Sequence, residues 1–160
     1  QLVKHDDNLD SLLQVTTDNF EAINKYLQEQ EQSHLSVLML TGGWLEGLHL
    51  IQEVYNEKPS ATLKERIGEQ KIVLNQIVHL LAHYQDKNET ISKLHLNLVN
   101  LNHVFSEVKI ERIESDEVDY IFEDGIRIAV PKSSSQIIIS DEQIKEIEML
   151  VVETRKSVIG

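Results

Sequence analysis

The stretch that decides the fold is Thr41-Gly42-Gly43-Trp44-Leu45-Glu46-Gly47, which lies in the most apolar part of the chain. From Leu35 to Tyr55 the apolar residues lie on all sides of a helical projection. This pattern is typical of a helix that other helices surround. Lys58-Pro59 ends the segment, because proline disfavours helical geometry at the residue before it. We therefore predict a buried central helix in a mainly α protein.

The three glycines of this stretch need an explanation. Each glycine inside a helix costs about 1 kcal/mol relative to alanine, so together they cost roughly 3 kcal/mol. Gly43 and Gly47 lie on one helix face, where the missing Cβ atoms let a neighbouring backbone approach. Alternatively, the missing side chains open a pocket beside Trp44, with Glu46 or Thr41 pointing into it. We favour close packing with Trp44 in the core, and keep these five residues as the candidate ligand-binding site.

Helical signals continue on both sides of this stretch. The N-terminal part predicts short helices, the second beginning at Thr17-Asp18, where Asp18 and Glu21 have capping-box spacing. A turn follows near residue 33. Apolar residues at three- and four-residue spacing then predict two helices over 63–84 and 91–105. The short break at Asp86-Lys87-Asn88 makes them an antiparallel hairpin.

Beyond Phe105 the apolar pattern changes to alternation, which indicates strands. Asp124-Gly125 is a strong signal for a type I′ hairpin turn. We expect strands over 108–113, 118–122, 126–130 and 137–139, with a polar loop at 133–135. Ser140 and Gln143 form a capping box that opens a final helix. The predicted fold is a helical bundle with a small antiparallel β-hairpin or meander, at about 108–139, before the final helix.

Length and composition limit the class of protein. A chain of 160 residues with 41% hydrophobic content suits a single helical domain, 1–160. The net charge of -12 repels phosphates, so we do not expect a nucleic-acid partner. The apolar run from Leu35 to Ile51 is interrupted by Glu46 and His49 and is shorter than about 20 residues, so we expect no transmembrane helix. Protein or small-molecule partners remain.

Glu46-Gly47-Leu48-His49 matches the Glu-x-x-His spacing of carboxylate-bridged di-iron bundles. Such sites need a second motif, and the other instance, Glu31 to His34, falls at a helix junction. His79 and His83 have zinc-ligand spacing, but Leu80 stands where a zinc protease has its glutamate. His95 and His103 complete a site only if the two helices align them. We favour solvated histidines and expect no cofactor.

No Gly-x-Ser-x-Gly elbow, Walker loop or Gly-x-Gly-x-x-Gly fingerprint occurs in the chain, so nothing in the sequence points to catalysis. The absence of cysteine excludes disulfides and thiolate metal sites within these residues. We therefore expect a protein that binds rather than catalyses.

Three segments resemble a family of helical bacterial lipoproteins of unknown function. They are residues 40–48, which include Thr-Gly-Gly-Trp-Leu-Glu-Gly-Leu, residues 65–71 (Glu-Arg-Ile-Gly-Glu-Gln-Lys) and residues 139–143 (Ile-Ser-Asp-Glu-Gln). The resemblance runs from about Asn8 to the final helix. It implies that the chain is the C-terminal portion of an exported protein, anchored through a lipid on a cysteine upstream of Gln1. Upstream helices of the same protein would then be packing partners.

The resemblance implies no activity and no catalytic residue. The family has an aromatic residue where His49 stands, which weakens the metal interpretation. Our functional expectation is a non-catalytic binding or assembly module on the periplasmic side of the cell envelope; a cytoplasmic location stays open. The alternative is a metal-binding protein or metal-dependent enzyme that uses Glu46 and His49, or His79 and His83.

Overall fold

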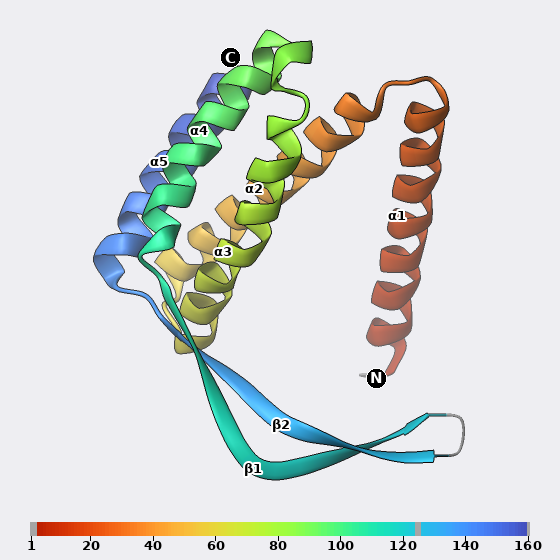
Figure 1. The fold of residues 1–160 in the computed structure, drawn as a ribbon, viewed down its shortest axis with the longest axis vertical. Helices are drawn as coiled ribbons and strands as arrows, with labels where there is room; N and C mark the ends of the chain where they lie inside the picture. The colour runs from red at the N-terminus through yellow and green to blue at the C-terminus, as the bar shows by residue number, and fades with distance from the viewer. Residues whose placement is uncertain (1–2, 124–125, 160) are drawn as a thin grey trace. The chain divides into compact units, whose positions relative to one another are not determined.

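The computed structural model describes residues 3–123 and 126–159, with side chains for 14–111 and 136–158. The chain divides into two compact units, Gln1–Gly43 and Trp44–Gly160. The boundary lies inside one helix, α2 (Ser33–Glu57). Figure 1 shows the order of the helices and strands along the chain. Each unit is described by itself.

The first unit contains α1 (Val3–Glu29) and the beginning of α2. The prediction of short helices here is wrong, because α1 is one continuous helix. No glycine or proline interrupts it. Asp18 does not cap a helix; its Oδ1 accepts a hydrogen bond from Gln14 Nε2 at 2.8 Å, one turn earlier. The predicted turn is confirmed: Glu31 has a φ of 58°, and α2 begins at Ser33.

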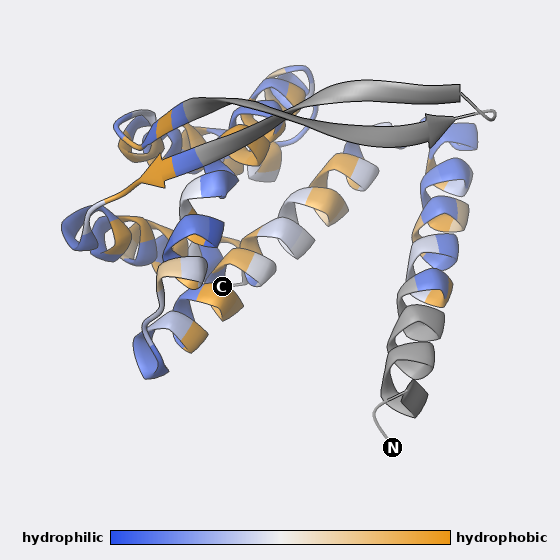
Figure 2. Ribbon diagram, turned by 90° about the horizontal axis from the view of Figure 1, so that it is seen from below, coloured by the Kyte–Doolittle hydropathy of each residue, from blue (hydrophilic) through white to orange (hydrophobic). Residues whose placement is uncertain are grey.

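α1 is amphipathic, and Figure 2 shows hydrophobic and hydrophilic residues in alternating bands along its described part. Phe20 and Ile23 lie three residues apart and therefore share a face. Both side chains are exposed in the structure.

The second unit is a helical bundle. After α2 come α3 (Ala61–Ala82), a short 3₁₀ turn η1 (Gln85–Lys87), α4 (Glu89–Ser106) and, after the strands, α5 (Asp141–Ile159). α4 packs against both α3 and α5, as Figure 1 shows. The core of the second unit is built from apolar residues of α2, α3, α4 and α5 and of the adjoining chain. Its fully buried residues include Leu48, Ile67, Leu74, Leu81, Ile91, Leu98, Leu101, Phe105, Val108, Ile147 and Val151.

Local capping signals fix where these helices begin. Ser60 Oγ accepts a hydrogen bond from Leu63 N at 3.2 Å and caps α3. The predicted capping box of α5 is confirmed. Ser140 Oγ accepts a hydrogen bond from Gln143 N at 3.1 Å, and Gln143 Oε1 accepts one from Ser140 N at 2.8 Å. Asn88 caps α4 by accepting from Thr90 N at 2.7 Å. Such caps satisfy backbone groups that have no partner within the helix.

The β element is a single antiparallel hairpin of β1 (Lys109–Glu123) and β2 (Ile126–Ile138). The predicted runs 108–113 and 118–122 belong to one strand, with an irregularity in pairing between Glu114 and Val118. The predicted loop at 133–135 is part of β2, because pairing with β1 satisfies its backbone hydrogen bonds. The Asp124-Gly125 turn lies outside the described residues. The predicted bundle with an inserted hairpin is confirmed.

Gly68 of α3 is the glycine at which this fold requires close packing. A Cβ added there would collide with Ile137 Cγ2 of β2 and contact Val108 Cγ1 and Ile139 Cγ2 at 3.5 and 3.6 Å. Lys71, one turn further along α3, donates hydrogen bonds to the carbonyl oxygens of Ser106 and Val108 at 2.9 and 2.6 Å. The hairpin is thus held against α3 at its base.

Candidate functional site

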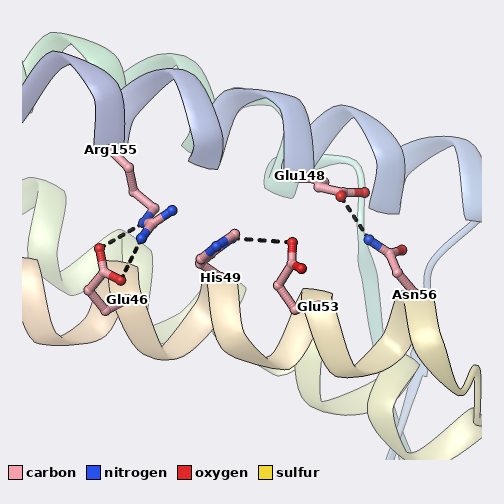
Figure 3. Close-up of polar contacts among 6 residues, drawn as sticks. All are labelled: Glu46, His49, Glu53, Asn56, Glu148 and Arg155. Atoms are coloured by element: carbon pink, nitrogen blue, oxygen red, sulfur yellow. Dashed lines mark hydrogen bonds and ion pairs between the residues drawn. The ribbon is translucent and has the colours of Figure 1, made fainter.

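A row of polar side chains joins α2 to α5 within the second unit (Figure 3). We call it the polar seam, and it consists of Glu46, His49, Glu53, Asn56, Glu148 and Arg155. The four residues of α2 recur at three- and four-residue spacing and so lie on one helix face. Here α2 meets its neighbour through polar groups.

Glu46 and Arg155 form the strongest contact of the polar seam. Arg155 Nε and a terminal guanidinium nitrogen donate to the two carboxylate oxygens of Glu46 at 2.7 and 2.8 Å. This paired geometry matches the guanidinium fork to the carboxylate and is stronger than a single bond. At the other end, Asn56 Nδ2 donates to Glu148 Oε1 at 2.8 Å. The two contacts hold α2 and α5 in register.

His49 lies between these two contacts. Its Nδ1 is 3.9 Å from Glu53 Oε1, one turn further along α2. The His49 side chain is only 15% exposed, whereas that of Glu53 is 57% exposed. The Nδ1 atom is buried and has no hydrogen-bond partner in the structure. A buried polar atom without a hydrogen bond lowers the stability of the fold, so His49 is expected to destabilise the contact between α2 and α5.

Gln52 is a second buried polar side chain of α2. It is 1% exposed, and neither its Oε1 nor its Nε2 has a hydrogen-bond partner in the structure. Leu45 and Leu48 occupy the preceding positions of the same buried face. Gln52 therefore occupies a position where an apolar residue would be expected. The sequence signal was a polar residue at apolar spacing, and it escaped the sequence reasoning.

The electrostatics of the polar seam favour the ionised form of Glu46. Hydrogen bonds from Arg155 hold the pKa of Glu46 below its usual value of 4.5. Partial desolvation opposes this shift, while the positive charge of Arg155 adds to it. Glu46 is therefore a carboxylate that is already bound to a cation.

Acidification tests this pairing. A lowered pKa in the folded state stabilises the protein above about pH 4.5, and this stabilisation is lost as the pH falls through the folded-state pKa. We expect Glu46→Gln to lower the free energy of unfolding slightly at neutral pH, because the pair is partly solvated. The difference in free energy of unfolding between wild type and variant should disappear as the pH falls below about 4.5, as measured by urea denaturation.

The control for this experiment is the same substitution in an Arg155→Met background. There the carboxylate has lost its partner, so Glu46→Gln should change stability little and equally at both pH values. A gap that stays constant from neutral to acidic pH in the wild-type background contradicts the pairing.

The structure brings the predicted metal ligands Glu46 and His49 together on one face of α2, but it commits Glu46 to Arg155. A metal ion would have to displace the guanidinium from both oxygens. The other Glu-x-x-His instance begins at Glu31, in the turn before α2. Within the described ranges, no three His, Asp or Glu side chains gather in a way that could hold a metal ion.

His79 and His83 lie at the end of α3, and both are exposed. His83 follows the last residue of the helix as its C-cap. His95, on α4, is half-buried, and His103 is exposed near the end of the same helix. In the described part of the chain, no hydrogen bond or ion pair joins any two of these four histidines.

Two of the candidate ligand-binding side chains use their polar groups in hydrogen bonds within the chain. Thr41, in the first unit, is fully buried, and its Oγ1 donates to the carbonyl of Val37 at 2.7 Å. Trp44, in the second unit, is half-buried, and its Nε1 donates to Gln70 Oε1 at 3.0 Å. The expectation of a satisfied indole N–H is confirmed. The ring is partly exposed rather than enclosed in the core.

Gly43 and Gly47 differ from the packed glycine of α3. A Cβ added at either would meet nothing within 4 Å. The predicted close packing across them is therefore not present in the structure. Leu50 and Val54 continue the same face at three- and four-residue spacing and are 61% and 52% exposed. We call Gly47, Leu50 and Val54, which all lie in the second unit, the open face of α2.

The expectation that α2 is buried on all sides is thus wrong. Leu45 and Leu48 are buried, whereas the open face is not. A helix with apolar residues all round can have one face in the core of its own chain and another available to a partner. Hydropathy cannot separate these two cases, because both faces read as apolar.

Sequence reasoning also missed Arg155, which lies 109 positions from its partner Glu46. Its only local signal was a basic residue near the end of an amphipathic helix. Among the described residues no helix is long and apolar enough to cross a membrane.

The fold and these surfaces define a class of acidic helical bundle with a β-hairpin at the base of one helix. Comparison with known proteins finds no matching family model, no matching curated protein and no matching solved structure.

Proposed function

We propose that this protein is a non-catalytic binding or assembly module of the bacterial cell envelope, and that it binds a helix of a partner protein on the open face of α2. The observation that carries the proposal is the empty space above Gly47, since no described atom lies within 4 Å of a Cβ added there. This glycine weakens its helix, and no described neighbour packs closely against it to offset that cost.

The energetics favour an external partner. A glycine inside a helix costs about 1 kcal/mol relative to alanine. Small residues recover such a cost where another helix approaches closely enough for backbone contact. Leu50 and Val54, both more than half exposed, would bury apolar surface in the same contact. A partner helix therefore fits the glycine and the two apolar residues of this face together.

The charge of α2 indicates the chemistry of the partner. The helix contains no lysine or arginine. Beside the open face, Glu53 has an exposed side chain, and Glu57 follows at the end of the helix. Complementary charges steer association and select partners. We expect the partner helix to have a small or apolar face flanked by basic residues.

The location at the envelope is supported by the resemblance of residues 40–48, 65–71 and 139–143 to helical bacterial lipoproteins. Fractionation of the native cells tests it, with the protein detected by antibody in the cytoplasmic, periplasmic and membrane fractions. Recovery with the membrane fraction, and its release by detergent, is the expected result. Recovery in the cytoplasmic fraction alone contradicts this part of the proposal.

Site-specific photo-crosslinking in the native cells tests the binding face. A photoreactive residue at Leu50 should give an adduct with a second polypeptide. Leu96 of α4 is the matched control, because it is also a leucine on a helix and is 62% exposed, against 61% for Leu50. We expect no such adduct from position 96.

A steric variant separates binding from folding. Gly47→Leu fills the space that a partner backbone would occupy and should reduce the adduct from position 50 by roughly tenfold or more. Gly47→Ala should retain folding, since nothing lies within 4 Å of the added Cβ, and should stabilise the isolated chain by up to about 1 kcal/mol. An adduct only within the chain, or none at position 50, overturns the proposal.

A further inference from the structure

A groove of about 330 Å³ lies between the middle of α3 and the C-terminal end of α4, at the point where β1 begins. Its polar lining consists of Lys71, Asn75, Gln76, Asn102 and Ser106. It is built entirely from the second unit, and none of its residues belongs to the open face or to the polar seam.

The carboxamides of this groove are free. No hydrogen bond joins the side chain of Asn75, Gln76 or Asn102 to another residue of the described chain. Each carboxamide presents two N–H donors and one oxygen that can accept two hydrogen bonds. Three such groups from two neighbouring helices therefore face a bound molecule with donors and acceptors in nearly equal supply.

The charge of the groove is close to neutral. Among the residues whose side chains are described, no acidic residue lines it, although the chain has a net charge of -12. Lys71 is the one charged residue of this described lining, and its ammonium donates to the carbonyl oxygens of Ser106, the last residue of α4, and of Val108. The negative end of a helix offsets a positive charge placed there. The groove therefore suits an uncharged ligand.

The remaining lining indicates which uncharged ligand fits. Ile72 and Ile110 add apolar walls, and the described lining contains no aromatic ring for a sugar to stack on. Ile110 belongs to β1, which pairs with only one other strand of the described chain. Carboxamides match the N–H and C=O groups of a peptide backbone, and exposed strand edges recruit extended peptides.

We propose that this groove binds a short, uncharged, extended peptide segment. Asn75, Gln76 and Asn102 bond its backbone, and Ile72 and Ile110 contact an apolar side chain. The volume is at the small end of the range for ligand pockets, about 300–1,000 Å³, which limits the bound part to a few residues. This site is separate from the helix-binding face and does not depend on it.

Nuclear magnetic resonance titration of the full chain tests the groove. The probes are end-capped, uncharged tripeptides with valine, leucine or alanine at the centre, added up to millimolar concentration. The side-chain amide signals of Asn75, Gln76 and Asn102 should shift in a saturable manner. Glucose and tripeptides with a central aspartate serve as the comparison ligands and should give no saturable shift.

Two variants complete the test. Asn75→Ala combined with Asn102→Ala removes two pairs of hydrogen-bonding groups and should weaken binding roughly tenfold. Asn100→Ala, at an exposed position of α4 outside the groove, is the matched control and should leave binding unchanged. No saturable shift with any neutral tripeptide overturns the proposal. Equal shifts with glucose, or equal binding by the double variant, overturn it as well.

Discussion

Gly68→Ala is expected to lower the free energy of unfolding by about 1 to 3 kcal/mol, although alanine is the better helix former. The added methyl group would collide with Ile137 Cγ2, which is attached to a branched carbon next to the β2 backbone. Ile137 can move this atom only by rotating about χ1, which is restricted in a β-branched side chain, or by moving β2 as well. The cost of overpacking should therefore exceed the gain in helix propensity. Urea denaturation of the full chain measures the difference.

The matched control is Gly47→Ala, because the same chemical change there meets no neighbour. Helix propensity then acts alone, and stability should rise by up to about 1 kcal/mol. A double-mutant cycle with Ile137→Ala identifies the colliding atom, since Gly68→Ala should cost less when Cγ2 is absent. If Gly68→Ala stabilises the protein as much as Gly47→Ala does, the hairpin does not pack on α3 as described.

Gln52→Met is expected to raise the free energy of unfolding by about 1 to 3 kcal/mol. Methionine has nearly the shape of glutamine but brings no polar atoms into the core. The substitution removes two buried polar atoms that have no partner in the structure, together with the cost of desolvating them. The measurement is again urea denaturation at neutral pH.

Gln70→Met is the control for this prediction, because Gln70 is a glutamine whose polar atoms are used. Its Oε1 accepts from Trp44 Nε1 at 3.0 Å, and its Nε2 donates to the carbonyl of Arg66 at 3.2 Å. Replacing Gln70 by methionine leaves the Trp44 indole N–H without its partner, so the free energy of unfolding should fall by about 1 kcal/mol. Loss of stability in Gln52→Met would show that the Gln52 carboxamide is hydrogen-bonded after all.

The two outcomes also bear on function. A polar residue retained in a core at a cost to stability is often kept for something other than folding. Within the polar seam, Glu53 directly follows Gln52, and His49 lies about one turn before it. If Gln52→Met stabilises the chain, the polar groups between α2 and α5 become the next place to look for a functional constraint.

The helix ends were predictable because capping is local. Ser60, Asn88 and Ser140 each lie within three residues of the backbone N–H that they bond, so short sequence patterns contain the whole interaction. The same reasoning failed at Asp18. A capping-box spacing inside an uninterrupted amphipathic run does not start a helix when the chain on both sides is already helical.

The strand boundaries were only partly predictable. Alternation located the β element, but the serine run at 133–135 appeared to be a loop. Pairing with residues 112–114 makes it a strand, because the partner strand supplies hydrogen bonds that composition cannot reveal. Residues so paired can be polar without ending the strand.

By itself, the sequence determined the mainly helical class, the place of the hairpin before the final helix and most of the helix starts, because these follow from periodicity and from contacts a few residues apart. Only the tertiary structure decided which glycine is packed tightly, which is open and which cation binds Glu46. Those answers depend on pairs such as Gly68 with Ile137 and Glu46 with Arg155, which are far apart along the chain. Glycines in a helix look alike in sequence, and only their neighbours in space distinguish a packed position from an open one.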